Sequence, residues 1–144
     1  MEDFVIDIIV GRDTTSKSIR VDLPPFTLVG ATTRFGDLSA PLRDRFGVVH
    51  KLEYYSTDEL NEICTRTASI FETEIVKEAA VEIARRSRGT PRITNRLFRR
   101  VRDFADVLND GVISMDMCTL ALDKLHIDEL GLDSKDHDYL IGII

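Results

Sequence analysis

Hydroxyl and guanidinium side chains gather at two places in the first third of this 144-residue chain. Thr32 and Thr33 follow an apolar run, and a short turn at 41–47 carries Arg45. Guanidinium groups suit phosphate because their planar fork donates two parallel hydrogen bonds and stays charged. Alternatively, the arginines of the turn pair with Asp44 at the surface, which contributes little energy. The residue types therefore predict either a phosphate-sensing site or an ordinary solvated turn.

A further stretch that carries arginines includes Arg92. Arg92, Arg96 and Arg99 share one face of a helix, at spacings i, i+4 and i+7. Such a face can meet phosphates or an acidic protein surface. Residues 85–102 hold eight arginines and no acid, whereas 103–144 hold ten acids and two lysines. The net charge of −6 therefore hides a segregation of charge and does not exclude an anionic partner.

The chain has no phosphate-binding loop of the Walker A type. That loop needs the pattern G-x-x-x-x-G-K-[ST], because glycine amides wrap the phosphates and a lysine reaches the terminal ones. None of the eight glycines is followed by lysine. Asp128 and Glu129 are better interpreted as part of an acidic linker than as a Walker B pair, and Asp7 as a hairpin residue rather than a magnesium ligand. We therefore expect no nucleotide to bind tightly to this chain alone.

The sequence shows no pattern typical of a disulfide, a metal site or a membrane span. Cys64 and Cys118 stand far apart among apolar residues, with no C-x-x-C and no histidine at ligand spacing. This pattern predicts two buried, reduced thiols and no metal site. The sequence contains no run of eighteen apolar residues and no basic leader before an apolar stretch, so we expect a cytoplasmic protein without a membrane partner.

The elements that position these groups begin with a predicted β-hairpin. Apolar residues alternate over 4–10 and again over 19–23, on either side of a turn-rich stretch at 11–17. Ile9 makes the second face partly apolar, so we expect parts of both faces to be covered.

A buried strand is predicted after the hairpin. Pro24 and Pro25 end the pairing, and the apolar run 26–31 is typical of a strand inside a parallel sheet. Its carboxyl end would deliver Thr32 and Thr33, where open α/β sheets place their ligands.

Four consecutive helices are expected between 56 and 126. Each begins where an apolar repeat of helical period begins, at Ser56, Lys77, Pro91 and Ser114. Ser56 and Glu59 have the spacing of a capping box, and Thr90 can cap the helix that Pro91 opens. Val76 stands where a capping side chain would be expected. Four short helices in a row predict a small bundle.

The last stretch, 132–144, looks like the opening of a further helix capped by Asp133 or Ser134. It ends on apolar residues, and a hairpin with one strand cannot form a parallel sheet alone. We therefore expect the chain to be a piece of a longer protein.

Several runs of this sequence resemble the RuvB family of bacterial Holliday-junction branch-migration motors. These runs are 23–34, 40–49, 85–93, 95–97 and 128–133. The resemblance spans essentially the whole chain and implies an AAA+ protein. Its implied fold is an α/β remnant plus an all-α part: the C-terminal part of a large ATPase domain with β-hairpin and core strand in 1–55, a four-helix lid in 56–126, and a linker with the start of a winged-helix head in 127–144.

The resemblance also implies roles for individual residues. Arg45 would be an arginine finger, which in a hexameric ring reaches the γ-phosphate held by the neighbouring subunit. Thr32 or Thr33 would be sensor one, and Arg92 would be sensor two. The other residues implied to lie beside the nucleotide are Glu2, Asp3, Phe4, Tyr55 and Pro91. The hairpin residues implied to dock on RuvA, the family's junction-binding protein, are Ile8, Ile9 and Ile19.

Three hypotheses for function follow. The first is a fragment of an ATP-dependent DNA helicase that drives Holliday-junction branch migration in recombination and DNA repair. Its full-length form would use ATP or ADP with magnesium and hold duplex DNA mainly through the head domain. The second is a non-catalytic AAA+ remnant that acts as a binding module or donates Arg45 to an intact partner. The third is a helical DNA-binding domain that uses the arginine face.

Overall fold

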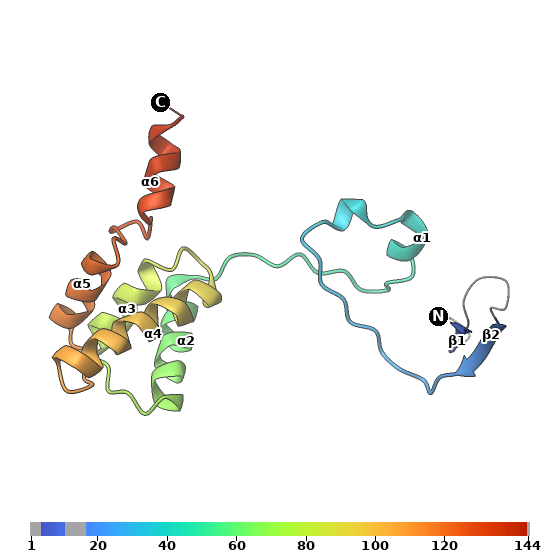
Figure 1. The fold of residues 1–144 in the computed structure, drawn as a ribbon, viewed down its shortest axis with the longest axis horizontal. Helices are drawn as coiled ribbons and strands as arrows, with labels where there is room; N and C mark the ends of the chain where they lie inside the picture. The colour runs from blue at the N-terminus through green and yellow to red at the C-terminus, as the bar shows by residue number, and fades with distance from the viewer. Residues whose placement is uncertain (1–3, 11–16, 144) are drawn as a thin grey trace. The chain divides into compact units, whose positions relative to one another are not determined.

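The computed structural model describes residues 4–10 and 17–143. These residues divide into two compact units, Met1–Val49 and His50–Ile144. The first unit contains a two-stranded sheet and short helical turns, and the second is helical (Figure 1).

The predicted hairpin is confirmed. Strand β1 (Val5–Val10) pairs antiparallel with β2 (Lys17–Asp22), so that Ile8 lies opposite Ile19. Asp7 lies opposite Arg20, and their side chains form an ion pair of 3.0 Å. The apolar side chains of the hairpin remain exposed on both faces: Ile6, Ile8, Ile9, Ile19 and Val21. The expected covering of these faces is therefore not supplied within the described residues of this unit.

The prediction of a buried strand at 26–31 is wrong. The segment is extended but belongs to no strand, and its residues are exposed. A strand exists only when its backbone N–H and C=O groups pair with a neighbour, and no segment in the described part of the chain pairs with this one. Its contacts are local: Phe26 packs edge-on against Phe4, with ring centroids 5.9 Å apart, and Gly30 faces the ring of Phe46.

Two short helical turns follow, η2 (Phe35–Asp37) and α1 (Ala40–Arg43). The second unit then contains α2 (Thr57–Ile70), α3 (Lys77–Arg85), α4 (Pro91–Leu108), α5 (Met115–Lys124) and α6 (Ser134–Ile141).

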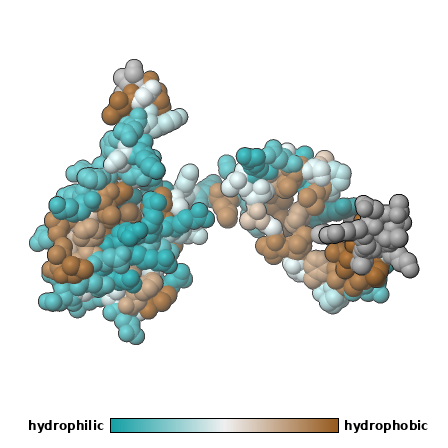
Figure 2. Space-filling view, in the orientation of Figure 1, coloured by the Kyte–Doolittle hydropathy of each residue, from teal (hydrophilic) through white to brown (hydrophobic). Residues whose placement is uncertain are grey.

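The four expected helices form and share one core. Figure 1 shows α2 to α5 gathered together, with α6 projecting from the group. Residues at helical spacing on α4 point inward, where buried side chains of α2, α3 and α5 meet them. The α4 residues are Leu97, Phe98 and Val101, and the residues from the other helices are Cys64, Ile83, Cys118 and Leu122. Apolar residues are exposed along α6 (Figure 2), among them Tyr139, Leu140 and Ile141.

Helix starts mostly follow their capping residues. Ser56 and Glu59 form the predicted capping box, and the Ser114 hydroxyl accepts the N–H of Met117. For α6 the cap is Asp133, not Ser134. Thr90 occupies the predicted N-cap position of α4, but its hydroxyl donates to the carbonyl of Arg88 and makes no capping hydrogen bond.

Helix α3 begins at Lys77, as expected, and ends at Arg85. Arg88 and Gly89 both adopt positive φ, which turns the chain sharply into α4. This turn explains why the Thr90 side chain faces back rather than toward the helix start.

Both thiols are buried and free, as predicted. Burial raises the pKa of Cys64 and that of Cys118 to about 12, so each thiol stays protonated and unreactive. None of the helices in the described part of the chain is long and apolar enough to cross a membrane.

Candidate functional site

The two threonines differ in what their hydroxyl groups do. The Thr32 hydroxyl accepts the backbone N–H of Arg34 at 2.9 Å, which closes a tight local turn. Thr33 is exposed, and its hydroxyl makes no hydrogen bond to any described residue. The Thr32 hydroxyl is therefore committed to the turn, whereas the Thr33 hydroxyl is not.

The arginines near α1 also divide by role. Arg34 pairs with Asp37 at 3.8 Å, and the Arg43 guanidinium lies over the ring of Phe35, 5.7 Å from its centroid. Arg45 follows the end of α1, where its backbone N–H donates to the carbonyl of Leu42. Its side chain is exposed. The short helix therefore presents Arg45 to the surface, where it could reach an external phosphate.

In the second unit, Tyr55 is brought to the start of α4. Its backbone N–H donates to the carbonyl of Gly89 at 2.9 Å. Gly89 has a φ of +73°, and a Cβ there would lie 2.7 Å from the Cβ of Tyr54. Only glycine permits this approach. The sequence alone does not reveal the place of Tyr54, because its contact with Gly89 joins residues far apart in the chain.

The start of α4 suits an anion. Pro91 occupies the first position and Arg92 follows it, so a guanidinium stands beside the outward-pointing amides of the helix. Arg92 is exposed and forms no ion pair with an acid of the described residues. The structure thus brings Tyr55, Pro91 and Arg92 together at one end of the helical unit.

An arginine-lined hollow runs along the exposed face of α4. It has a volume of about 640 Å³. Its lining residues are Arg92, Asn95, Arg96, Arg99, Arg100, Arg102 and Asp103. Arg99 and Arg102 lie over the ring of Phe71, at 5.8 and 4.7 Å from its centroid. The shared face predicted for Arg92, Arg96 and Arg99 is therefore confirmed.

The remaining predicted site residues lie in the first unit. Glu2 and Asp3 fall outside the described residues. Phe4 is exposed and packs on Phe26. The hairpin residues Ile8 and Ile19 face each other across the ladder, and Ile9 points to the opposite face.

Comparison with known families gives two matches. Residues 1–52 match the Holliday junction DNA helicase RuvB P-loop domain, and residues 55–128 match the RuvB AAA lid domain. The loop that gives the first domain its name is absent from this sequence.

Solved structures show the same likeness. The Thermotoga maritima RuvB Holliday junction branch migration motor is 50% identical over 85% of this chain and 41% of that chain, with a TM-score of 0.79. A proline-to-glycine variant of the same protein is 47% identical over 99% of this chain and 44% of that chain, with a TM-score of 0.83. The chain therefore spans less than half the length of these relatives.

Four Thermotoga maritima variants change an alanine to serine, a threonine to valine, an arginine to alanine and a proline to glycine, at successive intervals of 2, 12 and 46 residues. The same residue types occur at the same intervals here, in Ala31, Thr33, Arg45 and Pro91.

Because the lid-domain match alone covers more than half of the chain, the protein belongs to the RuvB family.

Proposed function

We propose that this chain is the nucleotide-sensing part of an ATP-dependent DNA helicase that drives Holliday-junction branch migration in recombination and DNA repair. One observation carries the proposal: Thr33, Arg45 and Pro91 repeat the residue types and intervals substituted in the Thermotoga maritima motor. The proposed parts are the end of the large ATPase domain in 1–55, the lid in 56–126, and the linker with the start of the winged-helix head in 127–144.

Arg45 is proposed to act on nucleotide held by the neighbouring subunit of a hexameric ring. The exposed position after α1 supports this role, because a side chain that reaches another subunit must leave its own surface. The neighbouring Arg43 lies over the ring of Phe35 and is not assigned this role. Thr33 is proposed as sensor one, since its hydroxyl is not committed to the turn that Thr32 closes.

Arg92 is proposed as sensor two, on the same subunit's nucleotide, with Tyr55 and Pro91 beside it. Phe4, Glu2 and Asp3 would complete the surroundings of the nucleotide. The donor set fits phosphate only in part, because Arg92 and the first amides of α4 suit an anion while the sequence offers no glycine-rich loop with lysine. ATP or ADP with magnesium would supply the free energy of the motor when bound to the full-length protein. This chain alone is therefore proposed to be inactive as an ATPase.

A mixing experiment with a longer RuvB-family protein that contains this sequence tests the role of Arg45. An Arg45→Ala subunit keeps its own nucleotide site, and a subunit with a disabled phosphate loop keeps its Arg45. If Arg45 acts across the interface, each variant alone loses roughly three to five decades of ATP turnover or all of it, and mixing the two restores part of the turnover. Arg43→Ala is the matched control and should retain activity. Mixtures as inactive as their components would show that Arg45 does not act on a neighbour's nucleotide.

The hairpin is proposed to bind a RuvA-like junction-binding protein. Ile8, Ile9 and Ile19 are 45%, 74% and 50% exposed, and exposed β-branched side chains of this kind mark interaction surfaces. Ile8→Asp should abolish binding to such a partner in a calorimetric titration, while Arg20→Ala should leave it within a fewfold of the original. Unchanged binding after Ile8→Asp would exclude this surface.

The arginine hollow supports a second candidate function, binding of duplex DNA by α4. Lys and Arg contacts to phosphate release counterions, so the affinity falls steeply with salt. Binding of this chain to duplex DNA should then weaken about tenfold or more between 50 and 200 mM salt and should be lost in Arg96→Glu. A flat salt response would dismiss this function.

The other alternative, a non-catalytic AAA+ remnant, would be favoured if the reading frame upstream of Met1 encodes no phosphate loop.

A further inference from the structure

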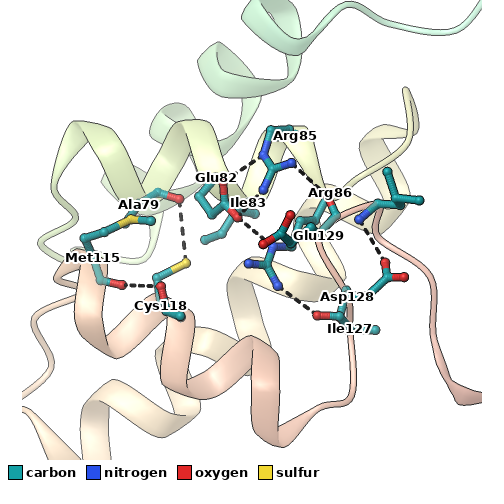
Figure 3. A network of polar contacts seen from close by, with 12 residues as sticks. Ala79, Glu82, Ile83, Arg85, Arg86, Met115, Cys118, Ile127, Asp128 and Glu129 are labelled. Carbon is teal, nitrogen blue, oxygen red and sulfur yellow. Dashed lines mark hydrogen bonds and ion pairs between the residues drawn. The ribbon is translucent and has the colours of Figure 1, made fainter.

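A buried ion pair lies at the end of α3. The Arg86 side chain is only 7% exposed, and its Nε lies 2.7 Å from Oε1 of Glu82 (Figure 3). Arg85 binds the same carboxylate from the surface side at 2.8 Å. Removing two charges from water is costly unless every donor and acceptor finds a partner. The buried pair therefore indicates that this end of α3 has a structural role beyond keeping the surface soluble.

The two arginines reach a segment more than forty residues away. Nη1 of Arg86 donates to the carbonyl of Ile127 at 2.8 Å, and Nη1 of Arg85 donates to the carbonyl of Glu129 at 2.9 Å. Both bonds are visible in Figure 3. Two adjacent guanidinium groups thus bind alternate carbonyls of the segment 127–132. Because this segment follows α5 directly, the end of α3 holds the chain where it leaves the helical group.

The bound segment is itself a closed loop. The Asp128 carboxylate accepts the N–H groups of Leu130 and Leu132 at 2.9 and 2.8 Å, and these bonds hold the pKa of Asp128 below its usual range, that of Leu132 most strongly. Gly131 is buried with a φ of +79°, and a Cβ there would overlap the carbonyl oxygen of Arg86. The loop therefore sits directly on the backbone of Arg86, at a distance that only glycine allows.

Two further contacts join α6 to this loop and to the turn after α3. Nε2 of His137 lies 3.0 Å from the Asp128 carboxylate, and Nη1 of Arg88 lies 3.0 Å from that of Asp136. Asp133 caps the helix between them. The first turns of α6 are thus attached to the loop on one side and to the turn 86–89 on the other.

We propose that Glu82, Arg86 and Gly131 form a clamp that makes the segment 127–132 and helix α6 one rigid body with the helical group α2 to α5. Arg86 is a positioning residue in this arrangement: its side chain binds Glu82 and the carbonyl of Ile127, and it is not among the proposed nucleotide contacts. A change in orientation at the start of α4, where Arg92 lies, is then transmitted to α6 instead of being lost in a flexible linker. The clamp itself does not depend on the proposed function and can be tested without nucleotide.

The distance between spin labels on α2 and α6 tests the clamp in this 144-residue chain. Labels are attached to Glu62→Cys and Tyr139→Cys, both at exposed positions, while the buried native thiols stay unlabelled. With the clamp intact, the distribution of distances should be narrow. Arg86→Ala should at least double its width, and the exposed Arg66→Ala on α2 should leave the width unchanged.

Gly131→Ala attacks the same contact from the loop side and leaves Arg86 in place. It should also at least double the width while the far-ultraviolet circular dichroism stays that of the unsubstituted chain. This variant decides the question if Arg86→Ala fails to fold. Widths that stay narrow in folded Gly131→Ala, or a distribution already broad in the unsubstituted chain, would overturn the proposal. Unfolding of the helical group by Gly131→Ala would overturn it too, because the loop would then be part of the core rather than a clamp on it.

Discussion

Substitution of Gly89 by alanine should release the segment that carries Tyr54 and Tyr55 from the start of α4. Two effects add. A non-glycine residue at a φ of +73° costs about 1–2 kcal/mol of stability. The new Cβ would also stand 2.7 Å from the Cβ of Tyr54, so the segment must move and lose the hydrogen bond from Tyr55, which contributes about 0.5–1.5 kcal/mol. We expect the free energy of unfolding to fall by about 1.5–3.5 kcal/mol as the sum of these two effects.

A second glycine offers a matched control. Gly111 has a φ of +81°, but a Cβ there would meet only Oδ1 of Asp106, at 3.4 Å. Gly111→Ala should therefore show the backbone strain alone, about 1–2 kcal/mol. Urea denaturation followed by circular dichroism at 222 nm measures both variants, and hydrogen exchange of the Tyr55 amide should accelerate only in Gly89→Ala.

The comparison isolates the contact from the strain. If both alanine variants lose the same free energy and the Tyr55 amide exchanges at the original rate in each, then the segment at Tyr54 and Tyr55 is not docked on Gly89. The placement of Tyr55 beside Arg92 at the start of α4 would then be wrong as well.

Three further predictions concern the helical unit. Ser56→Ala should lower the free energy of unfolding by about 1 kcal/mol through loss of the cap. The backbone N–H of Ser56, then its hydroxyl, lowers the pKa of Glu59 from 4.5, so the contribution of the Glu59 carboxylate is complete above pH 4.5 and disappears as the pH falls through the lower folded value; a urea midpoint that does not drop in this window, or drops equally in Glu59→Gln, would contradict the pairing. Phe98→Ala should cost about 3–5 kcal/mol because it opens a cavity in the core, and a loss under 1 kcal/mol in the same assay would mean that the site collapses freely. Cys64 and Cys118 should resist iodoacetamide at pH 8 in the folded chain and react in urea, and labelling without denaturant would show that the core opens readily.

Local signals in the sequence predicted local structure. Ser56 with Glu59, and Ser114, placed two helix starts correctly, because a cap acts over three residues and depends on nothing distant. Thr90 occupies the predicted N-cap position, but the preceding turn, with positive φ at Arg88 and Gly89, redirects its hydroxyl away from the helix.

The failed strand at 26–31 has a different cause. An apolar run tells which residues avoid water, but a strand also needs a neighbour to accept and donate its backbone hydrogen bonds. The described part of the chain offers none, so the residues are extended and exposed. The hydrogen bond from Arg34 to Thr32 likewise required coordinates, because the hydroxyls of Thr32 and Thr33 have the same chemistry.

The sequence by itself determined the helix starts, the hairpin, the segregation of charge, the lack of a phosphate loop and the likeness to the RuvB family. Each of these depends on residue type and on spacing within a few residues. Only the tertiary structure distinguished the eight neighbouring arginines from one another. Arg86 is buried against a distant loop, Arg88 binds α6, and Arg92 stands at the start of α4. Guanidinium groups are chemically identical, so the surroundings that the fold creates, and not the residue itself, assign their roles.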